Sequence, residues 1–195
     1  MSKMLHTKLT KALTNPEDPD WDVLVHNTLG LNTHPNRKQG FLLSREALRL
    51  ALAERGYRAE LKQLDVEDNH SLRIFPGLTL SLSHTPAAGA AIIADKVTYR
   101  SVGVDIESPS RKVKDSIIQR ISHPDDGSFL PIELWCLKEA CFKALMNSGE
   151  FPRPIEFSSI QVRAGAWAHS PSGLCGKLEV RLAEGLVLAE AYLEN

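Results

Sequence analysis

Two short segments of the sequence concentrate side chains that could bind a metal ion and move protons. The first holds Asp105 and Glu107, two carboxylates separated by one residue, and the second holds Glu139 and Lys143, a carboxylate and an ammonium group four residues apart. Carboxylate oxygens are the ligands that hard cations such as Mg²⁺ prefer, and a carboxylate can also act as a general base. These residue types suit metal-assisted chemistry on a phosphate group.

The segment around the first pair has the alternation of a β-strand. Branched apolar residues at 102, 104 and 106 face one side, and Asp105 and Glu107 face the other, about 6.6 Å apart along the strand. Gly103 is expected to leave space beside the two carboxylates, where a cation would relieve their repulsion. The alternative is an exposed edge strand whose acidic side is solvated.

The second pair lies in a segment, Glu133 to Asn147, with the pattern of a helix that is apolar on two opposite sides. One side carries Leu134, Leu137, Cys141, Ala144 and Leu145, and the other carries Trp135, Glu139, Phe142, Lys143 and Met146. A helix of this kind is expected to be buried on both sides, so its charges need partners. An ion pair between Glu139 and Lys143 is the simplest alternative to a catalytic role.

Together the segments resemble the signature motifs of a known family. Gly-Val-Asp-Ile-Glu at 103–107, Trp-Cys-Leu-Lys-Glu-Ala-Cys-Phe-Lys-Ala at 135–144 and Ser-His at 83–84 resemble, in order and spacing, the motifs of the 4'-phosphopantetheinyl transferase superfamily. That family moves the phosphopantetheine arm of coenzyme A onto a serine of an apo carrier protein and releases adenosine 3',5'-bisphosphate. The resemblance implies the same activity here.

The resemblance also assigns roles to residues of the two segments. Asp105, Glu107 and Glu139 would hold Mg²⁺, and Glu139 would also be the candidate base for the carrier serine. Lys143 would neutralise the leaving bisphosphate, with Lys138 assisting from the side of the helix.

Contacts with coenzyme A are implied for residues of the first half of the chain. These are Ser83, His84, Arg37, Lys38, Arg45 and Arg73. His84 would contact the 3'-phosphate, since an imidazole can become charged beside a dianion, although a histidine before Thr-Pro is also typical of a turn. The basic residues could equally be solvated.

The carrier protein is expected to dock on a basic segment. Arg111, Lys112 and Lys114 follow the acidic strand closely, and carriers of this family are generally acidic around the target serine. A nearby basic cluster would speed encounter with such a partner. A solvated loop is the alternative.

The rest of the pattern predicts an α+β fold with an internal repeat. A helix at 41–56 precedes strands at 78–83, 88–94 and 99–106, and the helix at 133–147 precedes strands at 157–163, 177–182 and 186–193. Residues 45–52 and 138–145 agree at half of their eight positions. We therefore expect two similar helix-plus-three-strand subdomains, 1–104 and 105–195, forming a pseudo-dimer with a cleft between them. The resembling family's longer, monomeric branch has this architecture. Residues 1–36 are expected to be irregular.

Composition limits the classes of partner. The chain has 195 residues, 43% of them hydrophobic, and a net charge of -1, so no overall field attracts nucleic acid or a membrane. No apolar run suggests a signal peptide or membrane span. Three cysteines without metal-site spacing predict neither a disulfide framework nor a zinc site. We expect a cytoplasmic monomer.

Two other functions would use the same residues. One is a different Mg²⁺-dependent enzyme that cleaves pyrophosphates, such as a hydrolase. The other is a non-catalytic module that binds carrier proteins.

Overall fold

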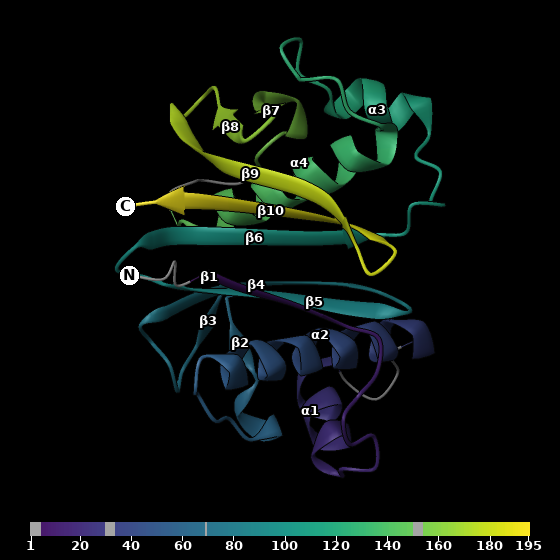
Figure 1. Cartoon of the computed structure of the whole chain (residues 1–195), viewed down its shortest axis with the longest axis vertical. Coiled ribbons are helices and arrows are strands. Elements are labelled where there is room, and N and C mark those ends of the chain that lie inside the picture. The colour runs from purple at the N-terminus through teal and green to yellow at the C-terminus, as the bar shows by residue number, and fades with distance from the viewer. Residues whose placement is uncertain (1–4, 30–33, 69, 150–153) are drawn as a thin grey trace. The chain divides into compact units, whose positions relative to one another are not determined.

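The computed structural model describes residues 5–29, 34–68, 70–149 and 154–195. The chain divides into two compact units, Met1–Asp95 and Lys96–Asn195. Each unit packs helices on antiparallel strands, which confirms the predicted α+β class (Figure 1). The boundary expected at 104/105 falls inside strand β6 (Tyr99–Glu107), which lies wholly in the second unit.

The first unit is built on an antiparallel sheet with the strand order β1-β5-β4. Its elements are β1 (Leu5–Thr10), α1 (Asp20–Leu29), α2 (Pro35–Glu54), η1 (Leu61–Gln63), β2 (Val66–Glu67), β3 (Ser71–Leu72), β4 (Leu78–Thr85) and β5 (Ala88–Asp95). Helix α2 lies between this sheet and α1 (Figure 1). The close approach depends on Gly89, where a Cβ atom would lie 2.1 Å from the backbone carbon of Leu43.

The expectation of irregular structure before residue 36 is wrong for residues 5–10 and 20–29, which form β1 and α1, whereas residues 11–19 are irregular as expected. Strand β1 pairs along its length with β5, from Leu5 opposite Ala94 to Thr10 opposite Gly89. Because its partner lies far away in the sequence, this pairing leaves no local periodic signal. Helix α1 follows, and it buries Trp21 and two aliphatic neighbours in the core.

Helix α2 begins six residues earlier than the apolar pattern suggested, at Pro35 rather than at 41. Proline suits the first helical position because its missing N–H would have no partner there. The side chain of His34 accepts a hydrogen bond from the backbone N–H of Asn36 at 3.3 Å and so caps the helix. Gly56, with φ of +77°, follows the helix end, as predicted.

The second unit is built on an antiparallel sheet with the strand order β6-β10-β9-β8-β7. Besides β6 its elements are α3 (Asp115–Ile121), α4 (Pro131–Asn147), η2 (Phe157–Ser159), β7 (Ile160–Arg163), β8 (Ala166–His169), β9 (Leu174–Ala183) and β10 (Leu186–Glu194). Helix α4 crosses one face of this sheet (Figure 1). The strands therefore do not divide between the units as expected. Strand β6, expected in the first unit, belongs to the second sheet, and β1 is the third strand of the first sheet.

Helix α4 is packed directly against the backbone of β6. A Cβ atom at Gly103 would lie 1.9 Å from the carbonyl oxygen of Ala140, so the glycine admits the helix rather than leaving open space beside the carboxylates. Cys136 and Cys141 of α4 are free thiols that are completely buried in the core, as their small size suggested. In the described residues, no helix combines the length and apolarity that a membrane span requires.

Candidate active site

Strand β6 and helix α4 bring together the carboxylates and the lysine that the sequence singled out. The ammonium group of Lys143 donates to Asp105 Oδ1 at 2.8 Å and to the carbonyl oxygen of Val104 at 2.9 Å. The indole N–H of Trp135 donates to Glu107 Oε1 at 3.1 Å. Although β6 is the edge strand of its sheet, Asp105 and Glu107 are only 6% and 8% exposed. The alternative of a solvated acidic edge is therefore wrong.

The third carboxylate, Glu139, lies half-buried on α4. Burial raises its pKa above the usual value, and the negative charge of Asp105 raises it further. Glu107 behaves alike, with its pKa raised first by burial and then by Asp105. The three carboxylates thus lie near enough to disfavour one another's charge. The alternative of an ion pair between Glu139 and Lys143 is not seen, because Lys143 pairs with Asp105.

A second cation, Arg111, balances the carboxylates. Its Nη1 atom pairs with Glu107 Oε1, the same oxygen that Trp135 contacts. The guanidinium carbon lies 5.2 Å from the centroid of the Trp135 ring, within the range of a cation–π contact. Arg111, which was expected only in a docking segment, is therefore held beside the expected metal ligands.

The donor set fits Mg²⁺ in kind, because three carboxylates supply hard oxygen ligands and their mutual repulsion would be relieved by a divalent cation. As the side chains stand, no three histidine, cysteine, aspartate or glutamate residues are grouped to hold a metal ion in the described part of the chain. Lys143 and Arg111 instead contact oxygens of Asp105 and Glu107.

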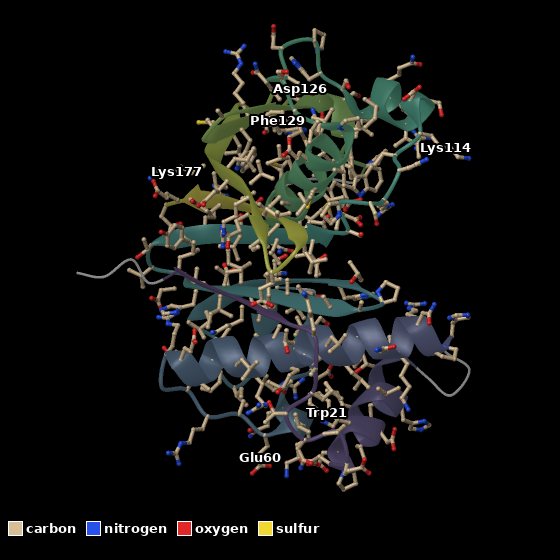
Figure 2. All side chains as sticks on the ribbon, turned by 45° about the vertical axis from the view of Figure 1, so that its right-hand side comes forward. Trp21, Glu60, Lys114, Asp126, Phe129 and Lys177 are labelled. Atoms are coloured by element: carbon tan, nitrogen blue, oxygen red, sulfur yellow. The ribbon has the colours of Figure 1, made fainter. Side chains whose placement is uncertain are left out.

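Lys138 lies elsewhere. It is completely buried, and its ammonium group lies 2.9 and 2.7 Å from the two carboxylate oxygens of Asp126 and also donates to the carbonyl oxygen of Ile160. Figure 2 shows Asp126 on the loop between α3 and α4. Ile160 belongs to β7, at the opposite edge of the sheet from β6. The structure thus places Lys138 apart from Asp105 and Glu107.

In the first unit, His84 is exposed near the end of β4, and Ser83 before it is buried. Gly40 of α2 provides the space for the imidazole, since a Cβ atom there would lie 2.3 Å from His84 Nδ1. The orientation of His84 is therefore constrained by the helix.

The four basic candidates differ in their surroundings. Arg45 is 9% exposed and lies with its guanidinium 4.4 Å from the centroid of the Phe41 ring. Its Nε atom is buried with no hydrogen-bond partner among the described residues, and burial lowers its pKa to about 10. Lys38 pairs with Asp22 and Arg73 pairs with Glu67, while Arg37 is exposed in the first turn of α2.

Glu46 stands at the position of α2 that the internal repeat matches to Glu139, and its surroundings are different. It is completely buried and accepts hydrogen bonds from Arg49 Nε at 2.7 Å and from the backbone N–H of Thr14 at 3.1 Å. Burial alone would raise its pKa, but the hydrogen bonds of Arg49 and Thr14 outweigh it, and the pKa is lowered. Of the two glutamates that the repeat relates, Glu139 has a raised pKa and Glu46 a lowered one.

Replacing Glu46 by glutamine should destabilise the chain in a pH-dependent way. Because the folded-state pKa lies below the ordinary value of 4.5, the stabilisation by Glu46 is present above pH 4.5 and is lost as the pH falls through the folded-state pKa. The variant should therefore unfold at lower urea concentration than the parent at pH 7, with the difference shrinking toward pH 3. If the urea midpoints of parent and variant differ by the same amount from pH 7 to pH 3, the ionisation of Glu46 does not contribute to stability.

Sequence reasoning missed the partners of the site residues. Arg111 comes four residues after Glu107, but that spacing predicts contact only inside a helix, and β6 ends at Glu107. Trp135 was assigned to an apolar face of the helix, and nothing in the sequence indicated that its indole N–H donates to Glu107. Asp126 lies in a loop without periodicity.

Comparisons with known proteins agree with the motifs. Residues 101–185 match the profile of the 4'-phosphopantetheinyl transferase superfamily. A curated relative, the 4'-phosphopantetheinyl transferase Npt of Nocardia iowensis, is 31% identical over 118 residues, which cover 55% of this chain and 51% of the relative. The chain thus aligns with about half the length of that relative. These findings confirm the predicted resemblance: residues 101–185, which hold the three carboxylates and both helix lysines, are similar to the 4'-phosphopantetheinyl transferase superfamily.

Proposed function

We propose that this protein transfers the 4'-phosphopantetheine group of coenzyme A to a serine of an apo carrier protein and releases adenosine 3',5'-bisphosphate. The observation that carries the proposal is the contact of β6 with α4, where Asp105 pairs with Lys143 and Glu107 accepts from Trp135, within a segment that matches the superfamily. Glu139, on the same helix, completes the set of acidic groups. A monomer in the cytoplasm, without nucleic acid or membrane partners, stays a prediction.

Asp105, Glu107 and Glu139 would hold Mg²⁺, which when bound would act as a Lewis acid on the pyrophosphate of coenzyme A. Their burial on β6 and α4 supports this role, since buried carboxylates that repel one another gain most from a cation.

Glu139 is the proposed general base. The raised pKa of its carboxyl group brings it closer to neutral pH, where a base is more effective. It would take the proton from the serine hydroxyl as the serine oxygen forms a bond to the phosphorus that carries the pantetheine arm. The bond from that phosphorus to the bridging oxygen breaks, and the bisphosphate leaves with the electron pair.

Lys143 is the proposed stabiliser of the leaving group. Its ammonium group is fixed by two acceptors on β6, the carboxylate of Asp105 and the carbonyl oxygen of Val104. A cation that is already oriented can stabilise developing negative charge without reorganising during the reaction. Lys138 has no direct part in this scheme, because its ammonium group is enclosed with Asp126.

Arg45 and His84 are the proposed contacts for the phosphates of coenzyme A. A buried guanidinium with an unsatisfied N–H is costly unless an anion pairs with it, so Arg45 is the strongest of the basic candidates. Arg37 and Lys38, in the first turn of α2, have weaker support, as has Arg73, because solvent or carboxylates already surround them. Ser83 is proposed to support His84 on β4.

His84→Ala should weaken binding of coenzyme A more than binding of its 3'-dephospho form. Coenzyme A that binds only the folded state raises the melting temperature, and the lost contact concerns one phosphate. The measurement is the thermal shift with each ligand, and His26→Ala, which changes an exposed histidine of α1, is the matched control. Equal losses for both ligands would show that His84 is only structural.

The deciding experiment is incubation of apo carrier proteins with coenzyme A, Mg²⁺ and this protein, followed by mass spectrometry of the carrier. We expect a mass increase equal to one phosphopantetheine group. Release of the bisphosphate without a carrier would instead indicate a hydrolase. Binding of the carrier without any product would indicate a non-catalytic module.

A further inference from the structure

Arg111 makes an unusual set of contacts for a residue beside metal ligands. Its guanidinium pairs with Glu107 Oε1, and it lies 5.2 Å from the centroid of the Trp135 ring. The indole N–H of Trp135 donates to the same oxygen at 3.1 Å. One carboxylate oxygen thus receives two donors, one of which is a full positive charge. In these contacts Arg111 does for Glu107 what a bound cation would do.

The two cations of the site, Arg111 and Lys143, differ in exposure and in the number of their acceptors. The side chain of Arg111 is 47% exposed, whereas the side chain of its partner Glu107, taken without the backbone, is 11% exposed. Lys143 is 25% exposed and is fixed by two acceptors, Asp105 and the carbonyl oxygen of Val104. A guanidinium at the surface can move into water at little cost, since exposed ion pairs contribute little. The carboxylate cannot follow, so it needs another cation when Arg111 leaves.

We propose that Arg111 is an exchangeable internal cation, which occupies Glu107 while no metal is bound and which a divalent cation displaces. The inference rests on the metal site of the proposed function. Mg²⁺ would bring twice the charge of a guanidinium, and carboxylate oxygens such as those of Glu107 are the ligands that it prefers. The displaced guanidinium leaves both Glu107 and the ring of Trp135 and becomes available to anionic groups.

The exchange predicts that removing Arg111 tightens metal binding. In Arg111→Gln the metal no longer competes with the guanidinium. The free energy of a half-exposed ion pair corresponds to a change of roughly fivefold in metal affinity. The measurement is calorimetric titration of the full chain with Mg²⁺ or Mn²⁺ alone, without coenzyme A. Thermal unfolding of each variant verifies that it is folded.

Two matched variants separate the contact from a general effect of charge. Lys112→Gln removes the same charge from the next position, where the side chain is exposed, and it should change metal affinity much less than Arg111→Gln. Arg111→Lys keeps the charge and should stay near the parent. Equal tightening in Arg111→Gln and Lys112→Gln would overturn the proposal, because only the long-range field would then matter.

Fluorescence gives a second readout that does not depend on activity. Mg²⁺ should change the emission of Trp135 as the guanidinium leaves its ring, and the change should be lost in Trp135→Phe and strongly reduced in Arg111→Gln. If Arg111→Gln responds to Mg²⁺ as the parent does, the guanidinium does not move and the proposal is wrong. Metal binding without any difference among the variants would overturn the exchange and leave the metal site standing. Absence of metal binding in every variant would refute the metal site itself, and the exchange with it.

Discussion

Asp105→Ala should abolish transfer of phosphopantetheine while the chain stays folded. Asp105 is the proposed metal ligand that also fixes Lys143, through the 2.8 Å contact between their side chains. Its loss therefore removes a carboxylate from the metal site and releases the cation proposed to stabilise the leaving group. Removing one preorganised electrostatic group from an active site typically costs about 10²–10³-fold in rate, and the loss here combines two such groups.

The measurement compares turnover with stability. Product formation is followed by the mass of the carrier protein, and thermal unfolding is recorded without Mg²⁺. We expect a modest change in melting temperature, because Asp105 is also a source of repulsion that raises the pKa values of Glu107 and Glu139. Turnover close to that of the parent would refute the assignment of Asp105.

Lys138→Met should cause the largest loss of stability, although Lys138 lies apart from the proposed chemistry. Lys138 is completely buried, and both oxygens of Asp126 contact its ammonium group. Removing the lysine leaves a carboxylate that is 8% exposed without its cation. Breaking a buried ion pair by deleting one partner typically costs about 3–5 kcal/mol.

Urea unfolding of two further variants tests the cause. Lys177→Met, which removes an exposed lysine paired with Glu194, should cost far less stability than Lys138→Met, because exposed ion pairs contribute little. Adding Asp126→Asn to Lys138→Met should recover part of the loss, because the amide carries no charge while its oxygen can still accept from the backbone N–H of Val162, as Asp126 now does at 2.8 Å. A double variant as unstable as the single one would show that the buried charge is not the cause.

The relative placement of the proposed metal ligands could be predicted from the sequence, because it depends on local periodicity. Alternation along β6 places Asp105 and Glu107 on one side of the strand, and helical spacing places Lys143 one turn after Glu139. The structure adds that this side of the strand faces α4, with Gly103 against Ala140. The motif had drawn attention to the glycine without revealing its partner.

What could not be predicted depends on contacts between segments that have no common period. The pairing of β1 with β5 and the ion pair of Lys138 with Asp126 join positions that no spacing rule relates. Lys138 precedes Glu139 in the motif and was therefore expected to act beside it. Neighbouring residues on a helix point about 100° apart. On α4 that rotation directs Lys138 to β7, whereas Glu139 lies near Asp105 of β6, at the opposite edge of the sheet.

The position of β6 in its sheet also bears on how the second unit folds. Within the described sheet β6 pairs with β10 alone, although β10 follows α4 and β7, β8 and β9 in the chain. Bringing β6 and β10 together closes a long loop, which costs conformational entropy before the hydrogen bonds of the pair form. Such non-local contacts slow folding. During synthesis the strand that carries Asp105 and Glu107 is therefore made early and has no partner strand until β10 has been made. Asp105 and Glu107 therefore lie on a strand whose pairing can form only after the ribosome has delivered β10.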